Sequence, residues 1–264
     1  MLSLITLSAI NAAIEAGNIL KKGFGTSFEI NSKVGINNLV TEYDHLAEAA
    51  IINQIKKAFP SHSFLAEESG KSGIFNTDEI QWVIDPLDGT VNFAHSLPVF
   101  SVSIAAVKNG EIISGVIYQP ILDELFYAEK GIGCYLNRKK VEVSDNAEFE
   151  SSFLVTGFPY NVNENPNKCI DTFVHVIQQG IPIRRLGSAA LDLAYTACGR
   201  FDGFWEVNLN PWDVAAGAIL VKEAGGKVTQ YNNEDYTIID NSILATNGKV
   251  HNRIVELLQC YCNI

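Results

Sequence analysis

The chain has 264 residues, of which 47% are hydrophobic and 19% charged, a composition typical of a globular protein with a sizeable core. Its formal net charge of −11 argues against nucleic acid as the main partner, because phosphate backbones are bound by clustered Lys and Arg. No run approaches the roughly 18 apolar residues of a membrane span, and five scattered cysteines without paired CxxC motifs favour reduced thiols in a cytoplasmic protein over disulfides or a zinc site.

The first half of the chain predicts helices combined with an antiparallel sheet. Apolar residues at helical spacing predict a first helix over residues 1–22 and a second from 41 to 59, ended by Pro60. The Asn109-Gly110 turn between two runs of β-forming residues predicts a hairpin. We expect strands at residues 63–66, 81–84, 100–107, 111–118 and 125–128.

The second half changes to an alternation of helix and strand patterns, which predicts a second α/β layer set. Helices are expected near residues 166–179, 188–198, 211–224 and 249–259, and strands near 153–156, 203–207, 227–230 and 242–246. We therefore predict an N-terminal half of 1–145 and a C-terminal half of 146–264 that form one compact unit.

The stretch WVIDPLDGT, residues 82–90, places two aspartates at the end of an apolar strand. The spacing of Asp85 and Asp88 lets both carboxylates and the Leu87 carbonyl face one point, and such an oxygen-rich set suits Mg²⁺. Gly89 lets the backbone turn, and Thr90 can cap a following helix whose free N–H groups would bind phosphate. Taken alone, the motif is explained as well by an Asx turn that closes the strand.

Two further carboxylates, those of Glu67 and Asp213, belong to the hypothesis of a Mg²⁺ site. Glu67 follows the strand at 63–66, and pairing of that strand with 81–84 would bring Glu67 near Asp85. Asp213 falls in the first turn of a helix that begins at Pro211, where it stabilises the helix dipole by about 0.3–1 kcal/mol without any metal. Each carboxylate has a structural explanation by itself, but structural explanations do not account for all of them together.

With these motifs the chain resembles the inositol monophosphatase family of the lithium-sensitive, Mg²⁺-dependent sugar phosphatase superfamily. The resemblance rests on AEES at 66–69, on WVIDPLDGTVNF at 82–93 and on NPWD through EAGG at 210–226. The segments LGSAALDLAY at 186–195 and GRFDGFWE at 199–206 are similar to bacterial members. The fold implied by the resemblance is a layered αβαβα sandwich, in the α+β or α/β class.

The resemblance also implies roles for individual residues. Two to three Mg²⁺ ions would be held by Glu67, Asp85, the Leu87 carbonyl, Asp88 and Asp213. Catalysis by a positioned water would involve Asp44, Thr90 and Glu67, with Lys33 near the metal-bound waters. The substrate would contact Asp88, Gly89, Thr90, Gly187, Ser188, Ala189, Glu206 and Asp213.

The activity implied is hydrolysis of inositol monophosphate, or of a similar small polyol phosphate, by attack of a metal-activated water. Histidinol phosphate, fructose 1,6-bisphosphate and 3′-phosphoadenosine 5′-phosphate are alternative substrates, because residues 156–160 and Asn210-Pro211 depart from the animal members. A regulatory binding protein associated with the transcription machinery is the alternative function, although the complete ligand set argues against a purely regulatory role. The family also implies a homodimer and inhibition by lithium.

Overall fold

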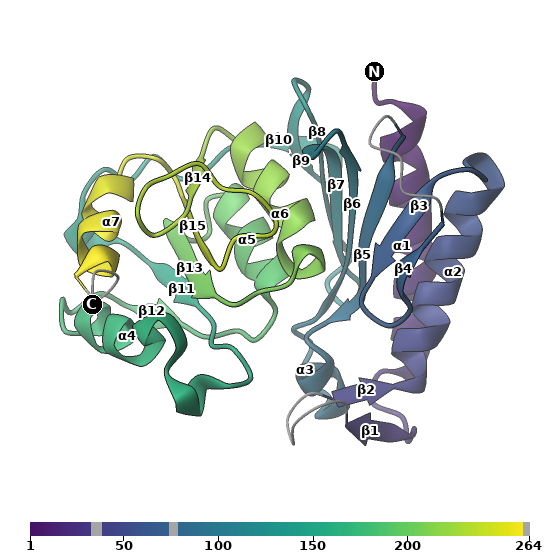
Figure 1. Cartoon of the computed structure of the whole chain (residues 1–264), viewed down its shortest axis with the longest axis horizontal. Coiled ribbons are helices and arrows are strands. Elements are labelled where there is room, and N and C mark those ends of the chain that lie inside the picture. Colours follow the sequence, from purple (N-terminus) through teal and green to yellow (C-terminus); the bar gives the residue numbers. More distant parts are fainter. Residues whose placement is uncertain (33–38, 74–78, 261–264) are drawn as a thin grey trace.

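The computed structural model describes residues 1–32, 39–73 and 79–260 and folds them into five layers (Figure 1). Helices α1 and α2 form one outer layer, followed by a large sheet, by helices α5 and α6, by a small sheet, and by helices α4 and α7. This order is the αβαβα sandwich that the resemblance implies.

The large sheet has eight strands in the order β10-β9-β8-β7-β6-β5-β3-β4. All neighbours are antiparallel except β3 and β5, which are parallel. Its strands are β3 (Ser63–Ala66), β4 (Gly70–Ser72), β5 (Gln81–Asp88), β6 (Ser101–Lys108), β7 (Glu111–Gln119), β8 (Glu124–Glu129), β9 (Gly133–Leu136) and β10 (Lys139–Val141). The expected strands are all present, and the short β4, β9 and β10 carry too few residues to give a periodic signal.

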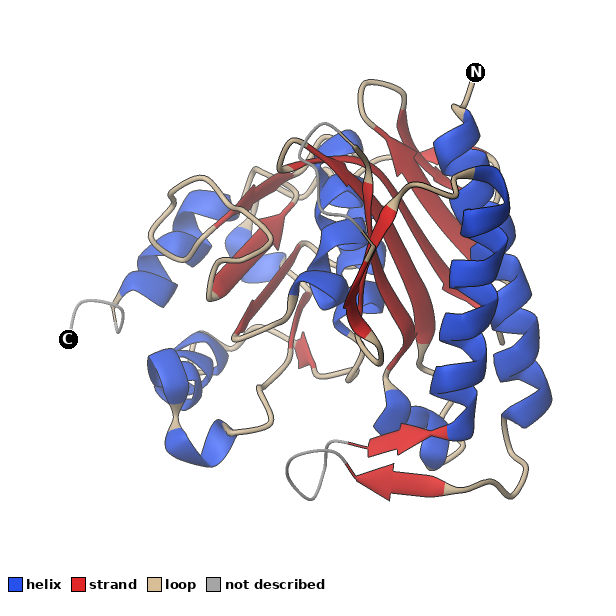
Figure 2. Ribbon diagram, turned by 45° about the vertical axis from the view of Figure 1, so that its right-hand side comes forward, coloured by secondary structure: helices blue, strands red, loops and turns tan. Residues whose placement is uncertain are grey.

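Two helices cover the outer face of the large sheet, as Figure 2 shows. They are α1 (Leu4–Gly23) and α2 (Glu42–Ala58), and between them the chain makes the hairpin β1 (Ile30–Ser32) and β2 (Leu39–Thr41). A short helix, α3 (Thr90–Ala94), follows β5. Both long helices match the predicted ranges closely.

The small sheet has five strands in the order β12-β11-β13-β15-β14, of which β12, β11 and β13 are mutually parallel. They are β11 (Leu154–Thr156), β12 (Ile183–Arg184), β13 (Gly203–Val207), β14 (Lys227–Thr229) and β15 (Ser242–Thr246). The helices are α4 (Cys169–Ile177), α5 (Ala189–Ala197), α6 (Pro211–Glu223) and α7 (His251–Gln259), with 3-10 turns at η1 (Phe149–Ser151), η2 (Val162–Glu164) and η3 (Pro166–Lys168).

Hydrophobic cores fill the spaces between the layers, and β5 contributes to two of them. Trp82 and Ile84 belong to the core under α1 and α2, whereas Val83 belongs to the core around α5 and α6. Side chains alternate between the faces of a strand, so a sheet covered on both sides needs apolar residues at every position.

Helix α6 lies in the central layer between the two sheets. Its eight consecutive residues from Val214 to Val221 are all buried, which explains why its sequence has no polar face. Although α6 is apolar, no helix within the described ranges is long and apolar enough to cross a membrane.

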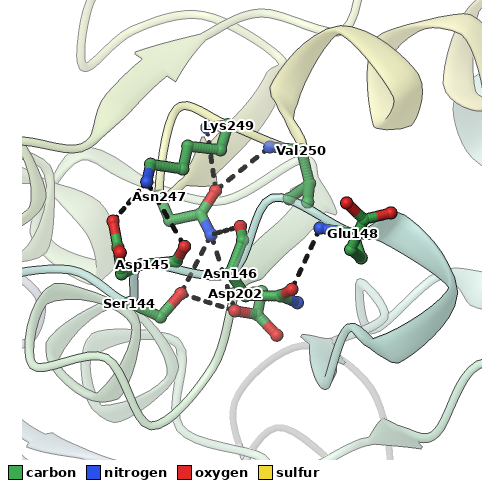
Figure 3. Close-up of polar contacts among 8 residues, drawn as sticks. All are labelled: Ser144, Asp145, Asn146, Glu148, Asp202, Asn247, Lys249 and Val250. Carbon is green, nitrogen blue, oxygen red and sulfur yellow. Dashed lines mark hydrogen bonds and ion pairs between the residues drawn. The ribbon is translucent and has the colours of Figure 1, made fainter.

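The connection from the large to the small sheet is fixed by a partly buried polar network (Figure 3). The Asp202 carboxylate accepts hydrogen bonds from Ser144 Oγ at 2.5 Å and from the Phe153 amide at 2.7 Å. The Asn247 side-chain amide donates to Ser144 Oγ at 2.9 Å and to the Asn146 carbonyl at 2.8 Å. The linker is thereby held against the small sheet where α7 begins.

His251 makes a second polar connection inside the C-terminal half. Its side chain is completely buried, and its Nε2 and Nδ1 atoms bond the hydroxyls of Thr229 at 3.1 Å and Thr246 at 2.9 Å. Burial, with a smaller contribution from Lys227, lowers the pKa of His251 from 6.5 to about 4. The imidazole is therefore neutral near pH 7 and joins β14 and β15 to α7.

Replacing His251 with Gln should reduce the acid sensitivity of folding. Because the pKa is lower in the folded protein, stabilisation by His251 is complete above about pH 6.5 and is lost as the pH falls towards 4. At about pH 7.5 the variant should lose roughly 1 kcal/mol of unfolding free energy through weakened hydrogen bonds. Between about pH 7 and pH 5, however, its unfolding free energy should decline less than that of the wild type.

Urea unfolding at several pH values measures this difference. A His45→Gln variant, in which the exposed His45 of α2 is replaced, serves as the control and should follow the wild type. An equally steep decline in wild type and His251→Gln would contradict the assigned role of the buried imidazole.

Candidate active site

One cavity of about 340 Å³ is lined by residues that follow strands of both sheets. The strands β3 and β5 of the large sheet and β11, β12 and β13 of the small sheet direct their carboxyl ends towards it, and α3, α5 and α6 begin beside it. Carboxyl ends of parallel strands and helix N-termini are common ligand sites, since both expose unpaired backbone groups. Apart from Lys33, which falls outside the described residues, and Asp44, the predicted site residues all line this cavity. These are Glu67, Asp85, Leu87, Asp88, Gly89, Thr90, Gly187, Ser188, Ala189, Glu206 and Asp213.

The parallel pairing of β3 and β5 brings Glu67 beside Asp85. Ala66 is in register with Ile84, and the Glu67 amide donates to the Ile84 carbonyl at 3.1 Å. The predicted neighbourhood of these two strands is therefore present in the structure.

An irregularity in β5 explains how two aspartates three residues apart line one cavity. Residues i and i+3 of a regular strand point to opposite faces. Asp85 is in register with Ser103 of β6 and Asp88 with Ser101. Between these two pairs, β5 therefore contains one residue more than β6. This bulge contains Pro86, a residue that cannot donate to a regular ladder. The extra residue brings both aspartates to the same side.

The turn after β5 depends on Gly89. Its φ is +94°, and a Cβ at this position would come within 2.9 Å of the Val99 carbonyl oxygen, so both conformation and space require glycine. Gly89 is also the N-cap residue of α3. The expectation that Thr90 caps this helix is therefore wrong, because Thr90 is its first residue.

The Thr90 hydroxyl instead joins the turn to α2. It lies 2.9 Å from the Leu87 carbonyl oxygen and 3.1 Å from Asp44 Oδ1. Asp44 is buried behind Thr90, where the amide and hydroxyl of Thr41 donate to its other oxygen at 2.7 and 2.6 Å. Burial raises the pKa of Asp44 to about 6, against the effect of these hydrogen bonds. Asp44 thus does not line the cavity itself but bonds the hydroxyl of Thr90, which does.

Asp88 connects the large sheet to the N-terminus of α5. Its Oδ2 atom accepts hydrogen bonds from Ser188 Oγ at 2.5 Å and from the Ala190 amide at 2.8 Å. Asp213, in the first turn of α6, accepts a hydrogen bond from the backbone N–H of Asn210 at 2.7 Å. Both carboxylates therefore have structural partners in addition to their place in the cavity wall.

The carboxylates of the cavity raise one another's pKa. Burial and then the charge of Glu67 raise the pKa of Asp85 well above its usual range, and burial followed by Asp88 does the same for Asp213. Burial raises the pKa of Asp88 to about 6, although the Ser188 and Ala190 hydrogen bonds oppose the shift. Among the described lining residues, Arg185 is the one cationic side chain. The cavity therefore concentrates negative charge that a cation would neutralise.

The donor atoms suit divalent cations, since they are all oxygens. Within the described ranges, no three His, Cys, Asp or Glu side chains already form a compact cation cage. Support for a metal site thus comes from the burial and mutual repulsion of the carboxylates, together with the oxygen chemistry of the donors.

The small sheet and the helix α5 beside it supply cavity residues that the sequence interpretation did not single out. They include Arg185 after β12, Tyr160 after β11 and Asp192 on α5. Glu206 on β13, which was predicted, is 6% exposed, and burial raises its pKa to about 8 despite the nearby Arg185. The sequence signal that could have identified Asp192 is its position as the one acidic residue in the otherwise apolar helix sequence AALDLAYTA.

Known proteins resemble the chain along nearly its whole length. The family model described as the inositol monophosphatase family matches residues 1–262. An inositol-1-monophosphatase of Synechocystis is 43% identical over 95% of this chain and 87% of its own. The Nus factor SuhB of Escherichia coli K12 is 42% identical over 92% of this chain and 91% of its own. The crystal structure of the extragenic suppressor protein suhB from Bartonella henselae superposes with a TM-score of 0.91 at 39% identity, covering 97% of this chain and 99% of that one.

Replacing Asp213 with Asn tests whether these carboxylates bind a cation. With Mg²⁺ at millimolar concentration, the melting temperature of the wild type should rise by a few degrees, because an ion that binds only the folded state stabilises it. The melting temperature of Asp213→Asn should rise by less than about half as much. In EDTA the variant should be as stable as the wild type or more stable by about 1 kcal/mol, since one repelling charge is gone.

Thermal unfolding with Mg²⁺ or with EDTA gives both quantities. Asp235→Asn, in an exposed loop, is the matched control and should keep the full response to Mg²⁺. An identical Mg²⁺ shift in wild type and Asp213→Asn would argue against a metal ligand at this position.

Proposed function

Since the chain belongs to the inositol monophosphatase family, we propose that it is a Mg²⁺-dependent phosphatase that hydrolyses a small polyol monophosphate, with inositol monophosphate as the first candidate. The observation that carries this proposal is the group of carboxylates on β5, α6 and the end of β3, gathered in one cavity where helices begin. Clustered, buried carboxylates destabilise the folded state when no cation is bound, and they can hold a catalytic metal ion when one is present.

Two to three Mg²⁺ ions would be held by side-chain or carbonyl oxygens of Glu67, Asp85, Leu87, Asp88 and Asp213. Bound Mg²⁺ would supply the positive charge that neutralises phosphate and would lower the pKa of a water enough to make it a nucleophile.

Asp44 and Thr90 would position the attacking water. When the Thr90 hydroxyl directs its proton towards Asp44, its oxygen can accept a hydrogen bond from a water in the cavity. Because the pKa of Asp44 is about 6, this carboxyl is mostly ionised near pH 7 and favours that orientation. The pair would therefore hold the water without becoming covalently modified.

Backbone groups would position the phosphate. The amides of Gly89 and Thr90 stand at the start of α3, and α5 and α6 also begin at the cavity. Helix N-termini attract anions through unpaired N–H groups and the helix dipole. Positioning and charge stabilisation account for most of the catalysis that phosphoryl transfer requires.

The other family expectations belong to the same proposal. Lithium would inhibit by replacing one Mg²⁺, and the protein would act as a cytoplasmic homodimer. Helix α4 offers an exposed apolar stripe for such a dimer, formed by Ile170, Val174 and Ile177 at helical spacing.

A regulatory binding function is the second candidate, because a relative that is 42% identical is named a Nus factor. The carboxylates Glu67, Asp85, Asp88 and Asp213 are all present, and a purely regulatory protein has no need of them. A stoichiometric partner in a pull-down, without phosphate release from any ester, would favour this candidate.

Phosphate release is the direct test of the enzymatic proposal. Inositol 1-phosphate, histidinol phosphate, fructose 1,6-bisphosphate and 3′-phosphoadenosine 5′-phosphate would each be incubated with the protein and Mg²⁺, Mg²⁺ plus Li⁺, or EDTA. We expect Mg²⁺-dependent release that Li⁺ inhibits, fastest from the inositol ester. Folded protein that releases phosphate from none of these esters would contradict the proposal.

Asp88→Asn should lower kcat by about 10²–10³-fold or more while leaving the fold intact, because it removes one negative charge from the cation site. An Asn can still accept the hydrogen bonds of Ser188 and Ala190, so circular dichroism should be unchanged. Asp235→Asn again provides the control, with full activity expected. Near-normal turnover by Asp88→Asn would refute the assignment of Asp88 as a metal ligand.

A further inference from the structure

The turn that carries Glu67 lies at one edge of the large sheet. It joins β3 to the edge strand β4 and consists of Glu67, Glu68 and Ser69. An edge strand is paired on one side only, so the ladder restrains this turn less than it restrains the centre of the sheet. The position of Glu67 therefore depends on what else fixes the turn.

Glu48 of α2 supplies that restraint. Its Oε2 atom accepts a hydrogen bond from the backbone N–H of Glu68 at 2.9 Å, and its Oε1 atom accepts one from the backbone N–H of Ser69 at 3.0 Å. The remaining backbone N–H of the turn, that of Glu67, donates to the Ile84 carbonyl of β5 at 3.1 Å. The three N–H groups of the turn thus have fixed partners, and Glu48 provides two of them.

The burial of Glu48 indicates that these hydrogen bonds have a purpose. The residue is 5% exposed, although carboxylates are seldom buried because removing one from water costs free energy. Two hydrogen bonds from backbone N–H groups offset part of this cost and fix both oxygens at once. Glu48 lies one helical turn after Asp44, whose side chain bonds Thr90. Helix α2 therefore holds the turn after β3 as well as the turn after β5.

We propose that Glu48 is a positioning residue, which fixes the turn between β3 and β4 and so holds Glu67 where it can bind a cation. This inference rests on the proposed phosphatase function, because it takes Glu67 as a ligand of bound Mg²⁺. Glu48 does not line the cavity, so it acts through Glu67 and not on the substrate. Replacing a residue that orients a metal ligand typically weakens metal binding by about 10–100-fold.

Glu48→Gln tests this role with little change in side-chain size. The new NH₂ group would face a backbone N–H that needs an acceptor, so the turn should shift. The quantity measured is the apparent Kd for Mg²⁺, obtained from the rise of the melting temperature with Mg²⁺ concentration, which requires no substrate. We expect this Kd to be about tenfold higher in Glu48→Gln than in the wild type.

A double-mutant cycle with Glu67→Gln separates positioning from the loss of a charge. A lost charge would weaken Mg²⁺ binding whether or not the Glu67 carboxylate is present, whereas lost positioning matters only while it is present. In the Glu67→Gln background, Glu48→Gln should therefore change the Kd by less than about twofold. Glu48→Asp keeps the charge on a shorter side chain, and it should also weaken Mg²⁺ binding.

Glu129→Gln is the matched control, since Glu129 anchors the other long helix. Its carboxylate on β8 accepts hydrogen bonds from the Ser3 backbone N–H at 2.9 Å and from the Thr6 hydroxyl at 2.5 Å, and it does not line the cavity. In EDTA, Glu129→Gln and Glu48→Gln should both melt at a lower temperature than the wild type, because each loses accepted hydrogen bonds. Glu129→Gln should nevertheless keep the Kd of the wild type for Mg²⁺.

The outcomes distinguish the inference from the function on which it rests. An unchanged Kd in Glu48→Gln, or an equal rise with and without the Glu67 carboxylate, would overturn the role of Glu48 and leave the phosphatase function standing. Absence of any Mg²⁺ response in the wild type would overturn both proposals. If the wild type binds Mg²⁺ but releases no phosphate from any ester, the function alone is overturned, and a rise in Kd that requires Glu67 would still support the role of Glu48.

Discussion

Repulsion among carboxylates in one enclosed cavity is the constraint on which the rest of this structure depends. Glu67, Asp88 and Asp213 each raise the pKa of Asp85, and Asp88 and Glu67 also raise that of Asp213, so the scaffold must hold these groups together against their mutual repulsion. The stiffness comes from layers that are buried on both faces, with α5 and α6 enclosed between the two sheets. Local hydrogen bonds to Asp88 and Asp213 then fix the side chains that packing alone would leave free.

The bulge in β5 is the local device that satisfies this constraint. A regular strand would have directed Asp85 and Asp88 to opposite faces, one of them into the apolar core under α1 and α2. One extra residue, placed at a proline, avoids that cost, and the strand ends at Asp88, just before the turn at Gly89. The irregularity of β5 therefore lies where the chemistry is expected.

Much of the fold and of the candidate site could be predicted from the sequence, because the signals were local. The helices at α1 and α2, the hairpin of β6 and β7, and the proximity of Glu67 to Asp85 all follow from periodicity, turn residues and strand pairing. The bulge and the partners of Asp88 did not follow, since Ser188 is 100 residues away and meets Asp88 only when the halves pack. Asp192 was missed for a similar reason: an acid in an apolar helix is informative only once the cavity beside it is known.

The division of the cavity between the two sheets has an evolutionary consequence. Glu67, Asp85 and Asp88 come from the large sheet, whereas Arg185, Asp192 and Glu206 come from the small sheet and the helix beside it. In the proposed phosphatase, substitutions at Arg185, Asp192 or Glu206 would therefore change the alcohol side of the cavity and leave the carboxylates of the large sheet in place. Only Asp213, on α6, would have to be kept on that side of the cavity for the proposed metal site to persist.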